Sequence, residues 1–163
     1  MKKVIVIGSP GAGKTTFCVK LKEKTGLPLF HLDAIWHRAD RTHIPREEFD
    51  ERLGEILAED RWIIDGNYSR TIERRLSACD TVILFDLPKE VCLDGAKSRL
   101  GKARVDMPWT DMELDPKLAM EIEEFSQKNL PQIYGLLEKY RDKQIVIFKS
   151  RAEADAYLNS ENE

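Results

Sequence analysis

The chain has 163 residues, of which 42% are apolar and 34% charged, a composition that suits one compact folded domain and excludes a disordered chain. Its net charge of −3 and pI of about 5.7 count against a protein that coats nucleic acid, so we expect no direct nucleic-acid binding. The sequence lacks the run of ~18 apolar residues that spans a membrane, and its three scattered cysteines suit reduced thiols in the cytoplasm.

The first predicted strand, residues 3–7, runs directly into a glycine-rich loop and then a helix over residues 14–24. Residues 8–16 read GSPGAGKTT and fit G-x-x-x-x-G-K-[ST], the pattern of a phosphate-binding loop between a buried strand and a helix. The glycines let successive backbone N–H groups point at an anion, and the start of the helix adds unpaired amides. We expect Lys14 to reach the β- and γ-phosphates of ATP and Thr15 to bind Mg²⁺. The residues expected to bind the nucleotide are Gly8, Pro10, Gly11, Ala12, Gly13, Lys14, Thr15 and Thr16.

A short second strand over residues 29–32 ends at Asp33. This carboxylate either accepts a proton from a substrate hydroxyl or hydrogen-bonds to the substrate; the structural alternative is an aspartate that caps a turn. Pro45 begins the next helix, whose apolar residues share one face. Trp36 lies between these elements and either stacks on a planar ligand or packs in the core. We expect residues 33–60 to form an insert that binds the phosphoryl acceptor.

The third and fourth strands, residues 62–65 and 81–86, each end in an aspartate, so either Asp65 or Asp86 fits the carboxylate that organises Mg²⁺. We favour Asp65, because Gly66 lets a ligand approach the backbone closely, whereas Asp86 precedes Leu-Pro as a helix cap does. Helix capping is the structural alternative for Asp65 as well. Helices are predicted over residues 70–78 and from Pro88 to about residue 100.

Residues 101–116 are polar and aperiodic, which predicts a lid-like segment. Two helical patterns follow, then a fifth strand over residues 144–148 and a closing helix over residues 151–158. Apolar strands that alternate with amphipathic helices are typical of a parallel sheet covered on both faces. We therefore expect one α/β domain over residues 1–163, with its ligand sites at the carboxyl ends of the strands.

Arginine recurs after three of the predicted strands, at the sheet edge that carries the phosphate loop. A single arginine there is ordinary surface charge. Three groups together favour recognition of phosphate oxygens by forked guanidinium groups. The groups are Arg38 and Arg41; Arg70, Arg74 and Arg75; and Lys97, Arg99, Lys102 and Arg104.

Several of these motifs resemble known families. Residues 65–72, DGNYSRTI, resemble the Asp-Gly-x-x-Arg-Thr-Ile stretch of adenylate kinases with one extra residue before the arginine, and residues 85–88, FDLP, resemble their Phe-Asp-x-Pro. The chain resembles the bacterial DNA topology modulation proteins more closely. These adenylate-kinase-related proteins share the phosphate loop, Leu-Asp-x-x-x-Trp (residues 32–36) and Trp-x-x-Asp-Gly-Asn-Tyr (residues 62–68). The resemblance covers residues 1 to about 104. It implies a three-layer P-loop NTPase fold, with a five-stranded parallel sheet of order 2-3-1-4-5, flanking helices and a short lid.

The resemblance also implies roles for single residues. Thr15 and Asp65 hold the metal, Arg70 contacts the acceptor, and Arg99 and Arg104 close over the transferring phosphate from the lid. Gly95 stands where adenylate kinases have a lid-helix arginine, so that Arg99 is a displaced substitute. The lid lacks zinc-binding cysteines, and the segment after the second strand departs from the AMP-site pattern, which leaves the acceptor open.

Two functional hypotheses follow. The first is an ATP–Mg²⁺-dependent phosphotransferase that acts in the cytoplasm on a nucleoside, a nucleotide or another small-molecule acceptor, as a monomer or a homodimer and without a membrane partner. The alternative is a nucleotide-binding regulator of the DNA topology modulation type, with little or no kinase activity. A hydroxyl acceptor benefits from a carboxylate base such as Asp33, whereas a phosphate acceptor needs only arginines.

Overall fold

The computed structural model describes residues 1–160; residues 161–163 of the expected domain lie outside the described range. Five strands alternate with helices along the chain. Within the described range, no helix is both long enough and apolar enough to cross a bilayer. The elements are β1 (Lys3–Gly8), α1 (Lys14–Thr25), β2 (Leu29–His31), α2 (Leu32–Trp36), α3 (Arg46–Leu57), β3 (Trp62–Asp65), α4 (Ser69–Ala78), β4 (Thr81–Phe85), α5 (Lys89–Ser98), α6 (Pro116–Lys128), α7 (Leu130–Lys139), β5 (Gln144–Phe148) and α8 (Arg151–Ser160).

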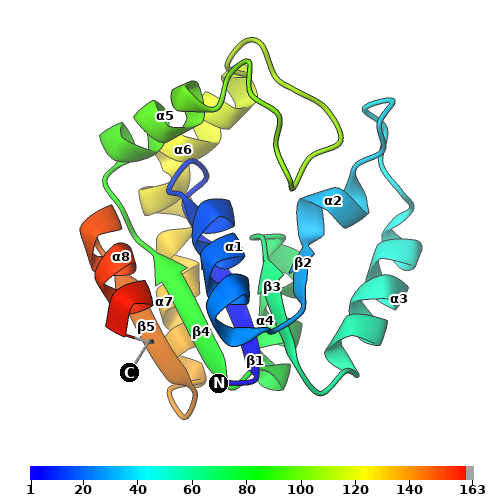
Figure 1. The fold of residues 1–163 in the computed structure, drawn as a ribbon, viewed down its shortest axis with the longest axis vertical. Coiled ribbons are helices and arrows are strands. Elements are labelled where there is room, and N and C mark those ends of the chain that lie inside the picture. The colour runs from blue at the N-terminus through cyan, green and yellow to red at the C-terminus, as the bar shows by residue number, and fades with distance from the viewer. Residues whose placement is uncertain (161–163) are drawn as a thin grey trace.

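The strands form one parallel sheet in the order β2-β3-β1-β4-β5 (Figure 1). This confirms the predicted fold class and strand order. The central strand β1 pairs on one side with β3, where Val6 is opposite Asp65, and on the other with β4, where Gly8 is opposite Phe85. The ends of β1, β3 and β4 therefore lie next to one another, and the residues that follow them share one edge of the sheet.

Alternate residues of β1 pack in two separate hydrophobic cores, because successive side chains of a strand point to opposite faces of the sheet. Ile5 and Ile7 pack in the core beneath α3, α4 and α7, whereas Val4 and Val6 pack in the core beneath α1, α5 and α8. All four are fully buried, as a strand covered on both faces requires. The result is the expected three-layer arrangement of helices, sheet and helices (Figure 1).

One short helix differs from the expectation. The second strand ends at His31, and α2 begins at Leu32. The sequence pattern had predicted that Leu32 belongs to the strand. Its closing hydrogen bond runs from the His37 N–H to the Asp33 carbonyl, over 3.0 Å. A single turn of five residues is too short to show helical periodicity, so its sequence carries no signal for it.

Residues between α5 and α6 form no helix or strand, as the aperiodic sequence predicted. This segment reaches from α5 across the end of the sheet toward α2 (Figure 1). It thus lies above the carboxyl ends of the strands, opposite the insert formed by α2 and α3.

Candidate functional site

The phosphate loop is built by close contacts that exclude side chains. Gly11 has φ +81°, and a Cβ placed there would lie 2.1 Å from the Cys92 carbonyl oxygen on α5. A Cβ on Gly95 would in turn lie 2.1 Å from the Gly11 carbonyl oxygen. Helix α5 and the loop therefore touch backbone to backbone. This contact explains why a glycine stands at position 95, where adenylate kinases have an arginine.

Lys14 lies across its own loop. Its Nζ donates to the carbonyl oxygens of Gly8 and Ser9, each over 2.9 Å. Burial lowers the pKa of the Lys14 ammonium, while the Asp65 and Asp33 carboxylates oppose that shift. To bind a phosphate, Lys14 must exchange two loop carbonyls for phosphate oxygens.

The end of β3 brings Asp65 to the first turn of α1. The buried Asp65 Oδ2 accepts from the Thr15 hydroxyl over 3.1 Å and lies 2.8 Å from His31 Nδ1. Asp106 Oδ2, from the lid-like segment, is 3.3 Å from the same hydroxyl oxygen. Mg²⁺ binds oxygen ligands octahedrally at about 2.0–2.1 Å, so neighbouring ligands lie about 2.9 Å apart. The hydroxyl and the two carboxylates therefore fit a magnesium ion.

Thr15, Asp65 and Asp106 do not supply enough ligands to coordinate a metal ion by themselves. Residues 1–160 contain no group of three or more His, Cys, Asp or Glu side chains that could hold a metal ion. A magnesium ion at this corner therefore needs phosphate oxygens and water as its remaining ligands.

Asp86, the other candidate carboxylate, is engaged elsewhere. Its Oδ2 accepts from the Tyr134 hydroxyl over 2.6 Å and pairs with Lys149. Asp86 does not line the cavity at the phosphate loop, whereas Asp65 does. The geometry thus separates the two candidates and agrees with the choice of Asp65.

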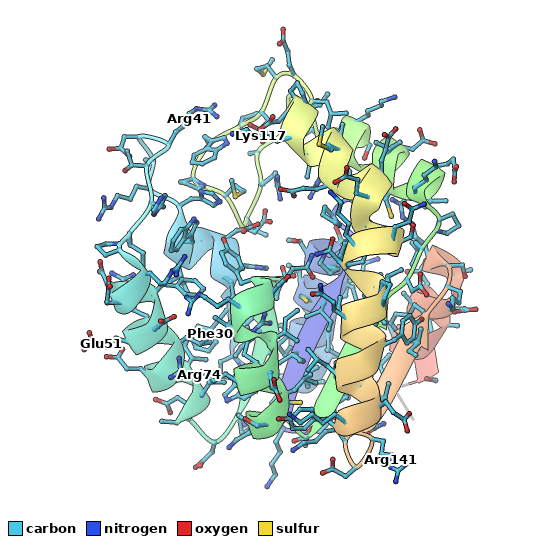
Figure 2. The ribbon with its side chains drawn as sticks, turned by 180° about the vertical axis from the view of Figure 1, so that it is seen from behind. Phe30, Arg41, Glu51, Arg74, Lys117 and Arg141 are labelled. Atoms are coloured by element: carbon cyan, nitrogen blue, oxygen red, sulfur yellow. The ribbon has the colours of Figure 1, made fainter. Side chains whose placement is uncertain are left out.

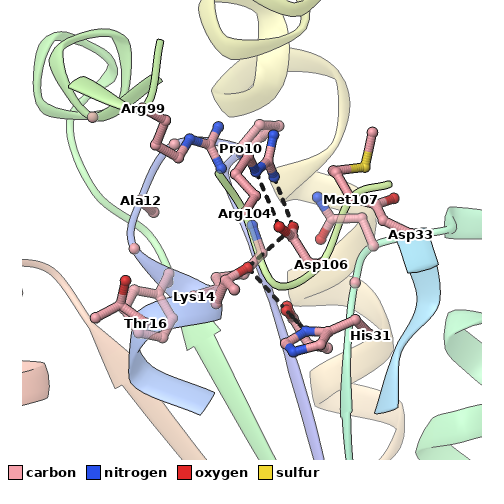
Figure 3. A pocket seen from close by; sticks show the side chains of 18 of the residues that line it. Pro10, Ala12, Lys14, Thr16, His31, Asp33, Arg99, Arg104, Asp106 and Met107 are labelled. Atoms are coloured by element: carbon pink, nitrogen blue, oxygen red, sulfur yellow. Dashed lines mark hydrogen bonds and ion pairs between the residues drawn. The ribbon is translucent and has the colours of Figure 1, made fainter. Parts of the chain in front are cut away.

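The lid-like segment places one arginine in an ion pair and leaves another unpaired (Figure 3). Arg104 binds Asp106 in a fork, with Nε to Oδ1 at 3.0 Å and Nη2 to Oδ2 at 2.7 Å. Burial opposes ionisation of Asp106, but Arg104 outweighs it and lowers the pKa of this carboxyl. Within residues 1–160, the Arg99 guanidinium makes no ion pair or hydrogen bond, and its Nε is buried without a partner. Arg99 is therefore the lid cation ready to accept an anion.

On the opposite wall of the cavity, Asp33 is held by a tyrosine. Its Oδ1 accepts from the Tyr68 hydroxyl over 2.7 Å, and His37 Nε2 is 4.0 Å from the same oxygen. Tyr68 has φ +37°, a left-handed conformation that few residues with a side chain adopt. Burial, followed by Asp33, raises the pKa of Tyr68 far above its usual range, so this hydroxyl stays protonated and donates.

The structure does not bring Arg70 to the cavity. Its guanidinium forms a two-bond pair with Asp50, at 3.1 and 2.7 Å, on the exposed side of α4. The expectation that Arg70 contacts the acceptor therefore does not fit this geometry.

Two residues of the site were missed or misplaced by sequence reasoning. Asn67 brackets the first loop glycine, because its Oδ1 accepts from the Gly8 N–H over 2.9 Å and its Nδ2 donates to the Gly8 carbonyl over 2.8 Å. Arg75, expected among the phosphate-binding arginines, is fully buried and donates to the carbonyls of Gly66 and Asn67. The Asp-Gly-Asn-Tyr motif was the available signal for Asn67.

The phosphate loop, Asp65, Asp33, Arg99 and the Arg104–Asp106 pair face one cavity of about 960 Å³ (Figure 3). The lid-like segment closes it by touching the insert: the Arg41 guanidinium lies 4.7 Å from the centre of the Trp109 ring, and Arg41 is 3.7 Å from Asp111. Trp36 does not line it and stacks instead on His43, with ring centres 4.2 Å apart, which is the core-packing alternative. The expected site residues that line the cavity are Pro10, Gly11, Ala12, Gly13, Lys14, Thr15, Thr16, Asp33, Asp65, Arg99 and Arg104.

Comparisons with known proteins concern the fold and the sequence as a whole. No family model matches the chain. The chain is similar to the adenylate kinase of Mycobacterium tuberculosis, at 29% identity over 170 aligned residues that cover 86% of each protein. It is 30% identical to the adenylate kinase of Thermotoga maritima over 102 residues, covering 58% of this chain and 46% of the other. A crystal structure of shikimate kinase from Bacteroides thetaiotaomicron matches with a TM-score of 0.58 and 15% identity, covering 96% of this chain and 94% of that one.

The chain has the fold of a P-loop kinase. The structural match shows the shared fold, and the sequence matches agree with the adenylate kinase resemblance of the motifs. The closer resemblance to the DNA topology modulation proteins stays a prediction.

Proposed function

We propose that this chain is an ATP–Mg²⁺-dependent phosphotransferase that moves the γ-phosphoryl group to a nucleoside, a nucleotide or another small-molecule acceptor. One observation carries the proposal. A phosphate loop with Lys14 and the Thr15–Asp65 corner opens into the same cavity as a tyrosine-held carboxylate, Asp33, and an unpaired lid arginine, Arg99.

Each of these residues has a separate role in the proposed in-line transfer. Lys14 and Arg99 offset charge on the transferring group once Lys14 leaves its loop carbonyls, and Arg104 joins them if it exchanges Asp106 for a phosphate. Magnesium at Thr15 and Asp65 supplies further neutralisation of phosphate charge. The lid-like segment excludes water from the cavity. Three free, buried cysteines are consistent with a location in the reducing cytoplasm.

The test is ATP-dependent ADP release across a panel of acceptors, with Mg·ATP binding measured by calorimetry. Lys14→Ala should abolish turnover, because no other side chain replaces its charge at the loop. Lys22→Ala, on the exposed face of the same helix, is the matched control and should behave as the wild type. Turnover that survives in Lys14→Ala would contradict the site. Mg·ATP binding without ADP release for any acceptor would instead support the nucleotide-binding regulator.

A further inference from the structure

We propose that the acceptor is a hydroxyl compound that carries no phosphate group, and that Asp33 is the catalytic base that accepts its proton. This inference rests on the proposed phosphotransferase function. The acceptor half of the cavity is the part lined by Asp33, His37, Arg41, Tyr68, Met107 and Trp109.

The Asp33 carboxylate is arranged to accept one proton. Tyr68 holds Oδ1 at 2.7 Å, whereas Oδ2 makes no hydrogen bond or ion pair with any residue in the range 1–160. The side chain is 38% exposed and faces the cavity. One oxygen is thus fixed and the other is open to a ligand, which is the geometry that a general base requires.

Lys117, which is exposed, lines the cavity at its opening, and the arginines near the acceptor half are engaged with other groups. Arg41, the arginine that lines it, stacks on Trp109 and faces Asp111. Arg70 is paired with Asp50 outside the cavity, and Arg74 donates to the Asp50 carbonyl over 3.1 Å. In Figure 2, Arg74 lies beside α3 and α4, well away from the opening where Arg41 and Lys117 are found.

Phosphate monoesters are bound by arginine or lysine side chains that donate several charged hydrogen bonds. Besides Asp33, the cavity wall carries the carboxylates of Asp111 and Glu121, whose charges repel a phosphate dianion. Lys14 and Arg99 also line the cavity, on the ATP side, and are needed for the transferring group, whereas Lys117 is exposed at the opening. The cavity therefore suits a neutral or cationic acceptor.

Aromatic side chains form the remaining wall. The rings of His37 and Trp109 meet edge to face, with centres 5.2 Å apart, and Met107 lines the same cavity as Asp33 (Figure 3). Such a surface packs against the body of a planar or apolar molecule while the carboxylate takes its hydroxyl.

The proposed transfer forms one bond at the γ-phosphorus and breaks another. The acceptor oxygen forms a bond to the γ-phosphorus, and the bond from that phosphorus to the β,γ-bridging oxygen breaks, its electron pair leaving with ADP. The hydroxyl proton moves to Asp33 Oδ2. A phosphate acceptor is already ionised at neutral pH and does not need a base. A carboxylate in the position of a base therefore favours a hydroxyl acceptor over a phosphate acceptor.

The experiment measures ADP release with Mg·ATP and matched acceptor pairs: adenosine and cytidine, their 5′-monophosphates, and a set of polyols and amino alcohols. A phosphate-free hydroxyl compound should have a kcat/KM at least about tenfold above any monophosphate. Asp33→Asn should lower kcat about 10²–10⁴-fold, the usual contribution of a general base, and leave the KM for ATP unchanged. Asp60→Asn makes the same chemical change at the opposite, exposed end of the sheet and should leave kcat unaltered.

Tyr68→Phe is the second variant, because it perturbs the base without removing it. Loss of the hydrogen bond that fixes Oδ1 should lower kcat by less than Asp33→Asn does and leave the KM for Mg·ATP unchanged. Preference for monophosphates, full kcat in Asp33→Asn, or Mg·ATP binding without turnover of any hydroxyl compound would each overturn the inference. If the wild type fails to bind Mg·ATP, the proposed function itself fails.

Discussion

Replacing Gly95 by alanine tests whether α5 presses directly on the phosphate loop. The new Cβ would lie 2.1 Å from the Gly11 carbonyl oxygen and 2.4 Å from Arg151 Nη2, whereas ordinary van der Waals contact begins at 3.4 Å. The arginine end can move aside. The loop carbonyl cannot, so α5 and the loop must separate by about 1.3 Å, the difference between 3.4 and 2.1 Å.

The expected magnitude comes from two opposing effects. Alanine in place of glycine inside a helix stabilises by about 0.5–1 kcal/mol. Overpacking a tight contact costs about 1–3 kcal/mol. Gly135→Ala is the matched control, because Gly135 lies within α7 and has no atom within 4 Å of an added Cβ. We expect Gly135→Ala to stabilise the protein and Gly95→Ala to have a free energy of unfolding about 1–3 kcal/mol below that control.

Urea unfolding of both variants measures this difference, and calorimetry with Mg·ATP measures its effect on the loop. Gly95→Ala should also weaken nucleotide binding, because displacement of the Gly11 carbonyl turns the adjoining amides away from the phosphates. Equal stabilisation by the two alanines, with unchanged nucleotide affinity, would refute the backbone contact between α5 and the loop.

Two further predictions concern contacts that the sequence did not reveal. Asn67→Ala should weaken binding of magnesium tripolyphosphate by up to about 30-fold, because the side chain loses both of its hydrogen bonds to the Gly8 backbone, each worth about 1 kcal/mol; unchanged affinity by calorimetry would contradict this. The Arg104–Asp106 pair should persist throughout neutral pH. The folded pKa of Asp106 lies below the ordinary 3.8, so the stability from the pair is full above that value and is lost as the pH falls through the folded pKa. A carboxyl-carbon NMR titration of Asp106 should give a pKa below 3.8, and a higher value would argue against the pair.

Local signals in the sequence were enough to predict β1, the glycine-rich loop and α1. A run of Val and Ile followed by glycines and Lys-Thr specifies a buried strand, a loop and a helix within fourteen residues, from Lys3 to Thr16. The parallel sheet and its strand order, which place that loop at the carboxyl edge, are confirmed. The same edge rule brought Asp33 and Asp65 into one cavity.

Contacts between segments far apart in the chain could not be predicted from local sequence patterns. Asp106 meets Thr15 across 91 positions of the chain, and the intervening lid-like segment has no periodicity that would orient it. The motif at residues 65–72 likewise gave no indication that Arg70 pairs with Asp50, twenty positions earlier in the chain, outside the cavity.

Arg75 shows why counting arginines at an edge overestimates the charge available to a ligand. It is fully buried, and burial lowers its pKa to about 10, with Asp65 opposing the shift. A buried cation needs hydrogen-bond acceptors, and the turn after β3 supplies the carbonyls of Gly66 and Asn67. The guanidinium therefore supports the turn from inside instead of facing the cavity.

That turn explains how the two halves of the site are aligned. Asp65 contacts Thr15, Asn67 brackets Gly8, and Tyr68 holds Asp33. These three consecutive connections are possible because β3 lies between β1 and β2 in the sheet, so its exit turn lies between the phosphate loop and α2.

Phosphoryl transfer needs the acceptor oxygen within about 3–3.5 Å of phosphorus, and small displacements cost large factors in rate. The turn after β3 contacts both Asp33, the proposed base, and the phosphate loop, so in the proposed reaction it positions one relative to the other. The lid-like segment then has a different task in the proposed reaction: it adds the charge of its arginines and excludes water, while the alignment of acceptor and donor is already set by the order of the strands.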